Sequence, residues 1–381
     1  MRHTLLFSLL VILLPGCASM FSGDDNADPP AELEKLTPEV TLKKLWGTKV
    51  GVGADEQLVN LVPVFYGDQI LAADRKGTVE ALDLNTGKRV WKTVTRKPIS
   101  AGPGVGEGLV LVGTSEAEVL ALSDETGEVV WEAMVTSEVL SIPRIDSGIV
   151  VVQTIDGNVS ALDADDGSRI WTYDRTVPVL TLRGSSSPAV ERGLVVAGFA
   201  SGKLVAIALE NGRVLWETSI ADPRGRSELE RMVDLDSDPL IDGNIVYVTT
   251  YHGRVASVDI TSGRMVWARD ISSHKGVDVD YNQIYLVDDG SNVWALSSDN
   301  GASVWKKDKL HGRALTTPVW FGDYVVVGDF EGYIHILSRL DGRLLARTRL
   351  DKAGIMAKPV QAGDNFYVFG MGGRLAAYTV E

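Results

Sequence analysis

A Gly residue placed four positions before a Trp recurs along the chain, and this repeat limits the fold more than any other feature. The first unit reads Gly87-Lys-Arg-Val-Trp91. The same spacing returns at Gly127 and Trp131, Gly167 and Trp171, Gly212 and Trp216, Gly263 and Trp267, Gly301 and Trp305, and at Gly342, where Ala346 stands in place of Trp. Seven matches at one spacing identify an internal repeat, which has to be interpreted before any single residue.

Each repeat contains short stretches in which apolar and polar residues alternate. Examples are residues 194–199, 204–209 and 213–216, which are separated by Ser-Gly and Asn-Gly dipeptides. Such dipeptides readily supply the positive φ that tight hairpins need, and alternation with a period of two is typical of half-buried strands. Each repeat is therefore predicted to form a four-stranded antiparallel meander.

The length of the repeat predicts how many meanders there are. The 336 residues from Trp46 to Glu381 divide into eight units of 42, which is close to the ~40–45 residues of a propeller blade. The last unit lacks its Gly-x-x-x-Trp strand, whereas an isolated strand around Trp46 precedes the first unit. We therefore predict an all-β, eight-bladed β-propeller, whose ring is closed because the N-terminal strand pairs with the C-terminal blade.

The Trp residues of the repeat have two interpretations. They could form a ligand platform, but one Trp at the same position of every blade is what packing between blades requires. We interpret them as structural residues at the blade junctions: Trp46, Trp91, Trp131, Trp171, Trp216, Trp267 and Trp305. Ala346 then predicts one junction that is packed less tightly than the others.

The N-terminus resembles the signal of a bacterial lipoprotein. Arg2 is followed by the apolar run 5–14, which is too short to span a bilayer, and Leu-Pro-Gly precedes Cys17 in the manner of a lipobox. We therefore predict a signal peptide at 1–16, lipidation of Cys17, an acidic flexible tether at 17–40 and the propeller at 41–381. Since Cys17 is the single cysteine, an intramolecular disulfide, a Cys-based zinc site and an Fe–S cluster are excluded.

Charge and motifs exclude several functions. The chain has 37 Lys and Arg against 51 Asp and Glu and no basic cluster, which argues against nucleic-acid binding. The five His residues lack metal-site spacing, and neither Gly-x-Ser-x-Gly nor a P-loop nor a Rossmann pattern is present. We therefore predict no catalytic, cofactor-binding or metal site, and no enzymatic activity.

Two unusually long connections point to a binding surface. The span from Trp171 to Pro188 is 17 residues and that from Trp216 to Pro239 is 23, whereas most blade-to-blade connections span 11–13. All such connections leave an up-and-down propeller on one face, so these two consecutive loops should lie side by side. Long loops on a rigid scaffold are where binding residues concentrate.

The unit from Ala81 to Trp91 resembles the tryptophan-docking motif of quinoprotein-like propellers. That superfamily includes dehydrogenases dependent on pyrroloquinoline quinone (PQQ) as well as lipoproteins without enzymatic activity, so the resemblance implies the fold and leaves the function open. Its enzymes hold the cofactor over two adjacent cysteines and a calcium ion. Because this chain has one Cys, that arrangement is excluded and no cofactor is expected.

The chain as a whole resembles the BamB family, lipoproteins of the outer-membrane β-barrel assembly (BAM) machinery, and the specific match is in the loop stretches 180–188 and 228–239. The resemblance implies a scaffold at the periplasmic face of the outer membrane that binds other BAM subunits and assists folding and insertion of nascent outer-membrane proteins. It also implies docking on the periplasmic POTRA domains of BamA through Leu180, Leu182, Arg183, Asp234 and Asp236. A PQQ-type enzyme and a glycan- or peptide-binding periplasmic lipoprotein remain the alternatives.

Overall fold

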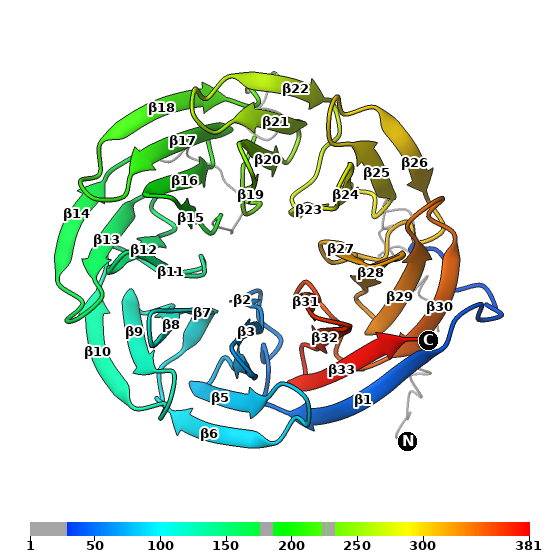
Figure 1. Cartoon of the computed structure of the whole chain (residues 1–381), viewed down its shortest axis with the longest axis horizontal. Coiled ribbons are helices and arrows are strands. Elements are labelled where there is room, and N and C mark those ends of the chain that lie inside the picture. The colour runs from blue at the N-terminus through cyan, green and yellow to red at the C-terminus, as the bar shows by residue number, and fades with distance from the viewer. Residues whose placement is uncertain (1–28, 176–185, 223–225, 227–232) are drawn as a thin grey trace, which may run out of the picture.

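Every repeat forms one blade of a closed ring. The computed structural model describes residues 29–175, 186–222, 226 and 233–381, and these residues form 33 strands and no helix. The strands make eight sheets arranged around a central axis (Figure 1). Within each blade the four main strands pair antiparallel, and in the first seven blades their order follows the chain from the innermost strand outward. The predicted eight-bladed β-propeller is confirmed.

The first four blades follow one another directly in the sequence. Blade 1 comprises β3 (Val64–Tyr66), β4 (Gln69–Ala73), β5 (Thr78–Asp83) and β6 (Arg89–Val94). Blade 2 comprises β7 (Ile99–Gly106), β8 (Leu109–Thr114), β9 (Glu118–Ser123) and β10 (Val129–Met134), with the short β2 (Asn60–Leu61) added in parallel to β7. Blade 3 comprises β11 (Arg144–Asp146), β12 (Ile149–Gln153), β13 (Val159–Asp163) and β14 (Arg169–Tyr173). Blade 4 comprises β15 (Ala189–Glu191), β16 (Leu194–Phe199), β17 (Lys203–Ala208) and β18 (Val214–Ser219).

The remaining blades repeat the pattern, and the last one also uses the first strand of the chain. Blade 5 comprises β19 (Leu240–Asp242), β20 (Ile245–Thr249), β21 (Val255–Asp259) and β22 (Met265–Arg269). Blade 6 comprises β23 (Asp278–Val279), β24 (Gln283–Val287), β25 (Val293–Ser297) and β26 (Ser303–Lys307). Blade 7 comprises β27 (Val319–Phe321), β28 (Tyr324–Gly328), β29 (Tyr333–Ser338) and β30 (Leu344–Arg349). Blade 8 comprises β31 (Val360–Ala362), β32 (Asn365–Phe369), β33 (Arg374–Val380) and β1 (Leu42–Lys49).

The ring closes through β1 and β33, which lie side by side in Figure 1 although they are the first and last strands of the chain. Their antiparallel register runs from Leu42 opposite Val380 to Lys49 opposite Arg374. The amide of Thr41 donates to the carbonyl of Glu381 at 2.8 Å, which extends the pairing by one step. The predicted closure is therefore confirmed, and blade 8 is built from both ends of the chain.

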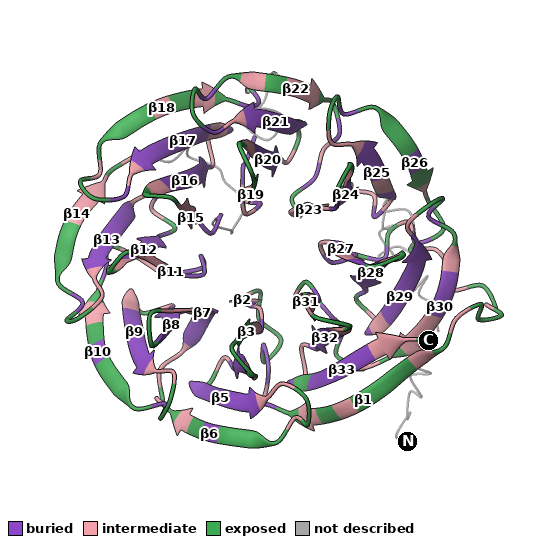
Figure 2. Ribbon diagram, viewed as in Figure 1, coloured by how far each residue is buried: buried purple, intermediate pink, exposed green. Residues whose placement is uncertain are grey.

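Burial follows the position of a strand within its blade. The second and third strands are almost completely buried, whereas the outermost strands expose alternate residues to solvent (Figure 2). Apolar side chains of neighbouring blades pack together into clusters between the sheets. No helix within the described ranges has the length and apolar character needed to cross a bilayer.

The Trp residues of the repeat lie at the blade junctions. Each indole Nε1–H donates to a backbone carbonyl in the next blade at 2.7–3.0 Å. Each ring also lies against a Gly of the next blade whose φ is between +66° and +73°, so that the repeat Gly receives the Trp of the preceding blade. The contacting pairs are Trp46 with Gly87, Trp91 with Gly127, Trp131 with Gly167, Trp171 with Gly212, Trp216 with Gly263, Trp267 with Gly301, and Trp305 with Gly342.

Ala346 occupies the corresponding position on β30, but this junction is well filled. Ala346 is only 2% exposed, and it belongs to a core cluster against which Val40 and Leu42 pack. The amide of Glu39 donates to the carbonyl of Leu345 at 2.8 Å. The expectation of a loosely packed junction is wrong, because the segment that leads into β1 fills the space that a Trp occupies elsewhere.

The two faces of the ring carry different loops. In such a meander, the blade-to-blade connections and the hairpin between the second and third strands of each blade emerge on one face, and the other hairpins emerge on the opposite face. We call the first of these the connection face. It carries both long connections, which link blade 3 to blade 4 and blade 4 to blade 5.

Residues 29–40 run along blade 7 outside β30, where Figure 1 shows the chain in dark blue. On the connection face, the amide of Ala31 donates to the carbonyl of His311 at 2.9 Å, and Nη1 of Arg313 donates to the carbonyl of Ala31 at 3.0 Å. Leu33 packs against the core cluster between blades 6 and 7. This segment, the end of the predicted tether, therefore makes specific contacts with the ring before β1 begins.

Candidate functional site

The two long connections meet at their described ends. Oγ of Ser186 donates to the carbonyl of Ser237 at 2.9 Å, and the amide of Ser187 donates to Oδ1 of Asp238 at 2.7 Å. The described ends of the two connections are therefore in contact on the connection face. Leu180, Leu182 and Arg183, the three candidate residues of the first connection, lie outside the described residues.

Asp234, a candidate of the second connection, lies beneath the surface. It is 0% exposed, and it forms an isolated antiparallel bridge with Tyr251, whose amide donates to the carbonyl of Asp234 at 2.8 Å. Leu235, also buried, packs over Gly198 of blade 4, where an added Cβ would lie 2.1 Å from the Leu235 side chain. The chain from Val233 to Leu235 is thus held down on blades 4 and 5, and no pattern in the sequence indicated this burial.

Asp236 follows two residues later and is half-buried. Burial raises the pKa of Asp236 to about 9, and the charge of Asp234 and a hydrogen bond with it add to the effect. Two neighbouring carboxyl groups of which one is protonated at neutral pH form an acid pair, as in other sites where like charges cannot both ionise. The structure therefore brings Asp234 and Asp236 together, with their carboxyl groups directed toward each other.

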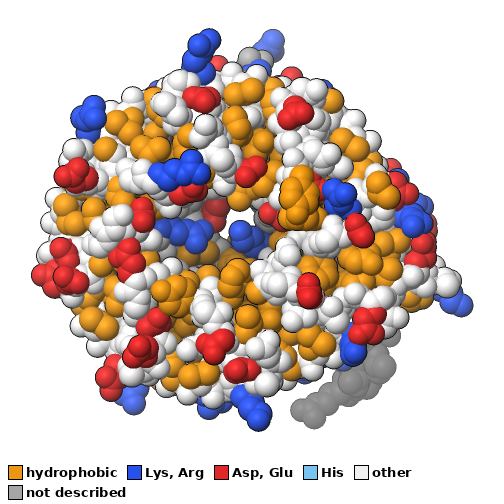
Figure 3. Space-filling model, in the orientation of Figure 1, with side chains coloured by type: hydrophobic (Ala, Val, Ile, Leu, Met, Phe, Trp, Pro, Cys, Tyr) orange, Lys and Arg blue, Asp and Glu red, His pale blue; other side chains and the backbone are white. Residues whose placement is uncertain are grey.

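A cavity of about 500 Å³ opens next to this acid pair, at the central end of the connection face. Its wall comes from the connections that enter six of the blades, and it combines apolar with charged side chains. The apolar lining includes Leu58, Val59, Leu61, Val62, Leu140, Leu240, Val277 and Met356, and the ionisable lining consists of Arg144, Asp236, Asp238, His274, Lys275 and Lys358. Figure 3, in the orientation of Figure 1, shows Lys or Arg side chains at the central opening of the ring.

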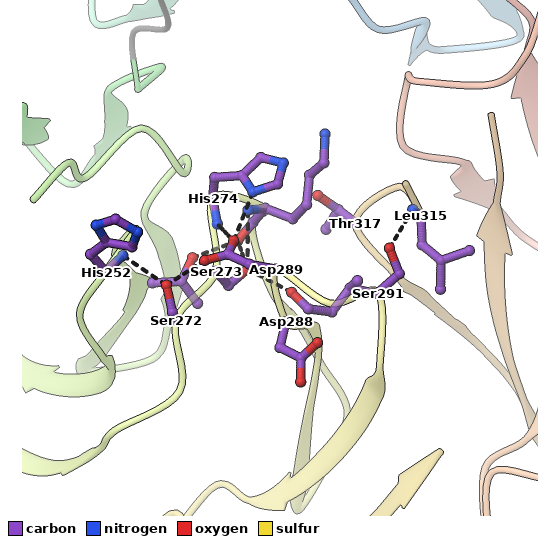
Figure 4. A network of polar contacts seen from close by, with 12 residues as sticks. His252, Ser272, Ser273, His274, Asp288, Asp289, Ser291, Leu315 and Thr317 are labelled. Atoms are coloured by element: carbon purple, nitrogen blue, oxygen red, sulfur yellow. Dashed lines mark hydrogen bonds and ion pairs between the residues drawn. The ribbon is translucent and has the colours of Figure 1, made fainter. Parts of the chain in front are cut away.

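One wall of the cavity is the connection between blades 5 and 6, and a network of hydrogen bonds fixes its shape (Figure 4). Nδ1 of His274 lies 2.8 Å from Oδ1 of Asp289, and Oγ of Ser272 donates to Oδ2 of the same carboxylate. The amide of Lys275 donates to Oγ of Ser273 at 3.0 Å, and the amide of Gly276 donates to Oγ1 of Thr317 at 3.2 Å. The backbone that carries His274 and Lys275 is therefore anchored on both sides.

The pKa values of two charged groups in this wall, Asp289 and Lys275, are lowered for different reasons. Burial opposes ionisation of Asp289, but the hydrogen bonds from His274 and Ser272 outweigh it, so the pKa of Asp289 lies below its usual range. Burial lowers the pKa of Lys275, and the charge of Asp289 offsets part of that effect. In the residues that the structure describes, no group of three or more His, Cys, Asp and Glu side chains is arranged to hold a metal ion.

Apart from Asp236, sequence analysis did not identify the residues that line the cavity. Arg144, Asp238 and Lys358 each adjoin a proline at the entrance to an inner strand, namely Pro143, Pro239 and Pro359. These prolines mark equivalent positions of the repeat, so a comparison of their neighbours would have shown charged residues arranged around the axis. Lys275 has no such marker, because Gly276 follows it.

Comparison with known proteins identifies the family. The family model described as outer membrane protein assembly factor BamB matches residues 75–307, which is more than half of the chain. A relative from Pseudomonas aeruginosa, named outer membrane protein assembly factor BamB, is 50% identical over 380 residues, covering 100% of this chain and 99% of its own. The chain belongs to the BamB family.

Solved structures agree with this assignment. BamB from Moraxella catarrhalis superimposes with a TM-score of 0.81 at 25% identity, covering 89% of this chain and all of that one. Quinohemoprotein alcohol dehydrogenase from Comamonas testosteroni matches with a TM-score of 0.68 at 13% identity, covering 88% of this chain and 76% of that one. The second likeness shows a shared propeller and carries no inference about PQQ chemistry. Membership of the BamB family thus fits an assembly factor better than the alternative of a quinoprotein enzyme.

Proposed function

We propose that this protein is a non-enzymatic scaffold subunit of the BAM complex that assists the folding and insertion of outer-membrane proteins. The observation that carries the proposal is the 50% identity to a BamB relative along the entire chain. The ring has the properties of a scaffold, since closure through β1 and β33 leaves no blade incomplete.

We further propose that the two long connections bind the POTRA domains of BamA. Their described ends lie in contact on the connection face, which supports a continuous binding surface built from both. Leu180, Leu182 and Arg183 would supply the contact with BamA. Asp234 is buried, so its role would be to fix the second connection, together with the half-buried Asp236.

The N-terminus would place this scaffold at the membrane. Residues 1–16 are proposed to act as the signal peptide and Cys17 as the lipid-bearing residue that holds the protein at the periplasmic face of the outer membrane. Because Ala31 is bound at the connection face, the anchored segment joins the ring on the same face as the two long connections. Other BAM subunits and nascent outer-membrane proteins complete the proposed set of partners.

The decisive experiment is co-purification of BamA with the tagged, lipidated protein from native membranes in mild detergent. Arg183→Glu, and separately Leu180→Asp combined with Leu182→Asp, should each reduce the recovered BamA at least about tenfold, as loss of a central interface contact does. Arg192→Glu is the matched control, because this exposed arginine lies in the hairpin between β15 and β16 on the opposite face. Unchanged recovery of BamA with both loop variants, in preparations that melt like the wild type, would refute the proposed docking site.

A further inference from the structure

The central cavity carries an inference that does not depend on how the ring docks on its partner. With a volume of about 500 Å³, it lies within the range of about 300–1,000 Å³ that small-molecule sites occupy. Its wall combines a continuous apolar part, including Leu58, Leu140 and Met356, with a few ionisable groups. That combination is typical of a site for an organic ligand whose charged end is fixed by specific side chains.

Cations are in excess among the side chains that line the cavity. Three of them are basic, namely Arg144, Lys275 and Lys358, whereas the acids are Asp236 and Asp238. Asp238 lies 3.7 Å from Arg144, and a pKa near 9 keeps Asp236 protonated at neutral pH. Neither Lys275 nor Lys358 therefore has an acidic partner within the lining, although the charge of Asp289 acts on Lys275 and that of Lys358 acts on Asp278 from outside it.

Lys275 and Lys358 are the two basic side chains of the lining that make no direct contact with a carboxylate. Among the residues that the structure describes, neither ammonium group makes a hydrogen bond or an ion pair, although acidic residues are abundant in this chain. Lys358 is exposed, but Lys275 is half-buried, and a half-buried ammonium without an ion-pair partner costs folding free energy. Such a cost is commonly retained where the group binds a ligand.

The position of Lys275 is fixed before any ligand arrives. Its backbone amide is bound to Ser273, the next residue is bound to Thr317, and the preceding His274 is held by Asp289 (Figure 4). Binding therefore does not have to order this wall of the cavity, and an anchored backbone reduces the entropic cost of binding.

We propose that the central cavity is a binding site for a small organic carboxylate, whose anionic end is held by Lys275 and Lys358 and whose apolar body packs against Leu58, Leu140 and Met356. This site lies at the axis, and Asp236 is the residue it shares with those predicted to bind BamA.

The test uses two probes of equal shape and different charge. Binding of 2-naphthoate and of the neutral 2-naphthamide is measured by isothermal titration calorimetry with the whole mature protein. The naphthoate should bind at least about tenfold more tightly than the amide, which corresponds to one charge-assisted contact. Lys358→Met and Lys275→Met should each weaken naphthoate binding about tenfold and leave the weak binding of naphthamide unchanged.

Lys352→Met is the matched control, because Lys352 is exposed in the same connection as Lys358 but does not line the cavity. It should bind naphthoate like the wild type. Since Lys358 is itself exposed, its replacement leaves the fold intact and decides the matter even if the Lys275 variant is unstable. Equal affinity for the two probes, wild-type affinity in the Lys358→Met protein, or no binding of naphthoate at millimolar concentration would each overturn the proposal.

Discussion

Asp236 shows how a single residue of the candidate site affects stability. In the folded protein its pKa lies near 9, whereas an Asp in the unfolded chain ionises near pH 4, so folding takes up a proton across this interval. Because the folded state then binds more protons than the unfolded state, the free energy of unfolding decreases as the pH rises from about 4 to about 9. Below this window both states are protonated and the residue has no effect.

Asp236→Asn should therefore stabilise the protein. Asn never ionises, yet it can still donate a hydrogen bond to Asp234, so at pH 7 we expect the free energy of unfolding to rise by about 1–2 kcal/mol, after allowance for the partial exposure of the site. Urea unfolding at pH 5, 7 and 9 measures this, with the exposed Asp242→Asn as control. An increase that is the same at all three pH values would contradict the assigned proton uptake.

The identity of Asp234 and Asp236 as site residues came from the resemblance to a family, and their environment could not be obtained from the sequence. Their burial depends on Leu235 settling over Gly198 and on Tyr251 pairing with Asp234. Both contacts join segments of different blades, and a repeat pattern contains no information on such contacts in one particular junction.

At the scale of elements, the repeat predicted the strands well, but it did not reveal which Trp packs against each repeat Gly. The spacing Gly-x-x-x-Trp lies within one unit, so it identifies the hairpin and the strand that follows. In the folded ring, however, Gly127 receives the ring of Trp91 from the preceding blade. The Gly and the Trp of one sequence unit therefore do not contact each other. Each repeat Gly contacts the Trp of the preceding blade, and only the closed ring shows this pairing.

This contact can be measured with a pair of glycines. In Gly127→Ala, the new Cβ would lie 2.4 Å from Cε3 of Trp91 at a residue with φ of +73°. In Gly148→Ala, φ is +75°, but the Cβ would meet no atom within 4 Å. We expect a loss of about 1–2 kcal/mol for Gly148→Ala from backbone strain alone, and about 3 kcal/mol or more for Gly127→Ala. If denaturant unfolding gives equal losses of unfolding free energy for the two variants, the packing of the Trp91 indole does not require Gly at position 127.

The segment before β1 was the element that sequence analysis described least well. Its acidic and Pro-containing composition indicated a flexible tether. For residues 17–28, which lie outside the described residues, the tether stays a prediction. From Ala31 onward, contacts to His311 and Arg313 hold the chain against blade 7. These partners are about 280 positions away along the sequence, so local composition could not indicate them.

At the scale of the whole molecule, the number of blades and the closure of the ring followed from the length of the repeat and the two incomplete units at its ends. The length of the repeat could not predict the central cavity, because its lining comes from connections of six blades that lie far apart in the sequence. Side chains at the axis become neighbours only when the ring has closed.

Removal of β1 tests how the ring holds together. Deletion of every residue before Gly51 leaves the seven complete blades intact but exposes the edge of β33 and one face of blade 8. We expect loss of the single cooperative thermal transition and association through the open edge, since unpaired strand edges promote aggregation. A chain that starts at Pro29 and keeps β1 is the control. A sharp melt at the wild-type temperature in the shorter chain would contradict closure as the source of cooperativity.

The last blade has a consequence for how the molecule is completed. β1 is synthesised first and its pairing partner β33 is synthesised last, so neither strand is paired until the last strand has been made. A chain that stops even one strand early therefore ends as an open arc instead of a slightly smaller ring. Closure of the ring therefore requires both β1 and β33, and loss of either strand leaves the other with an unpaired edge.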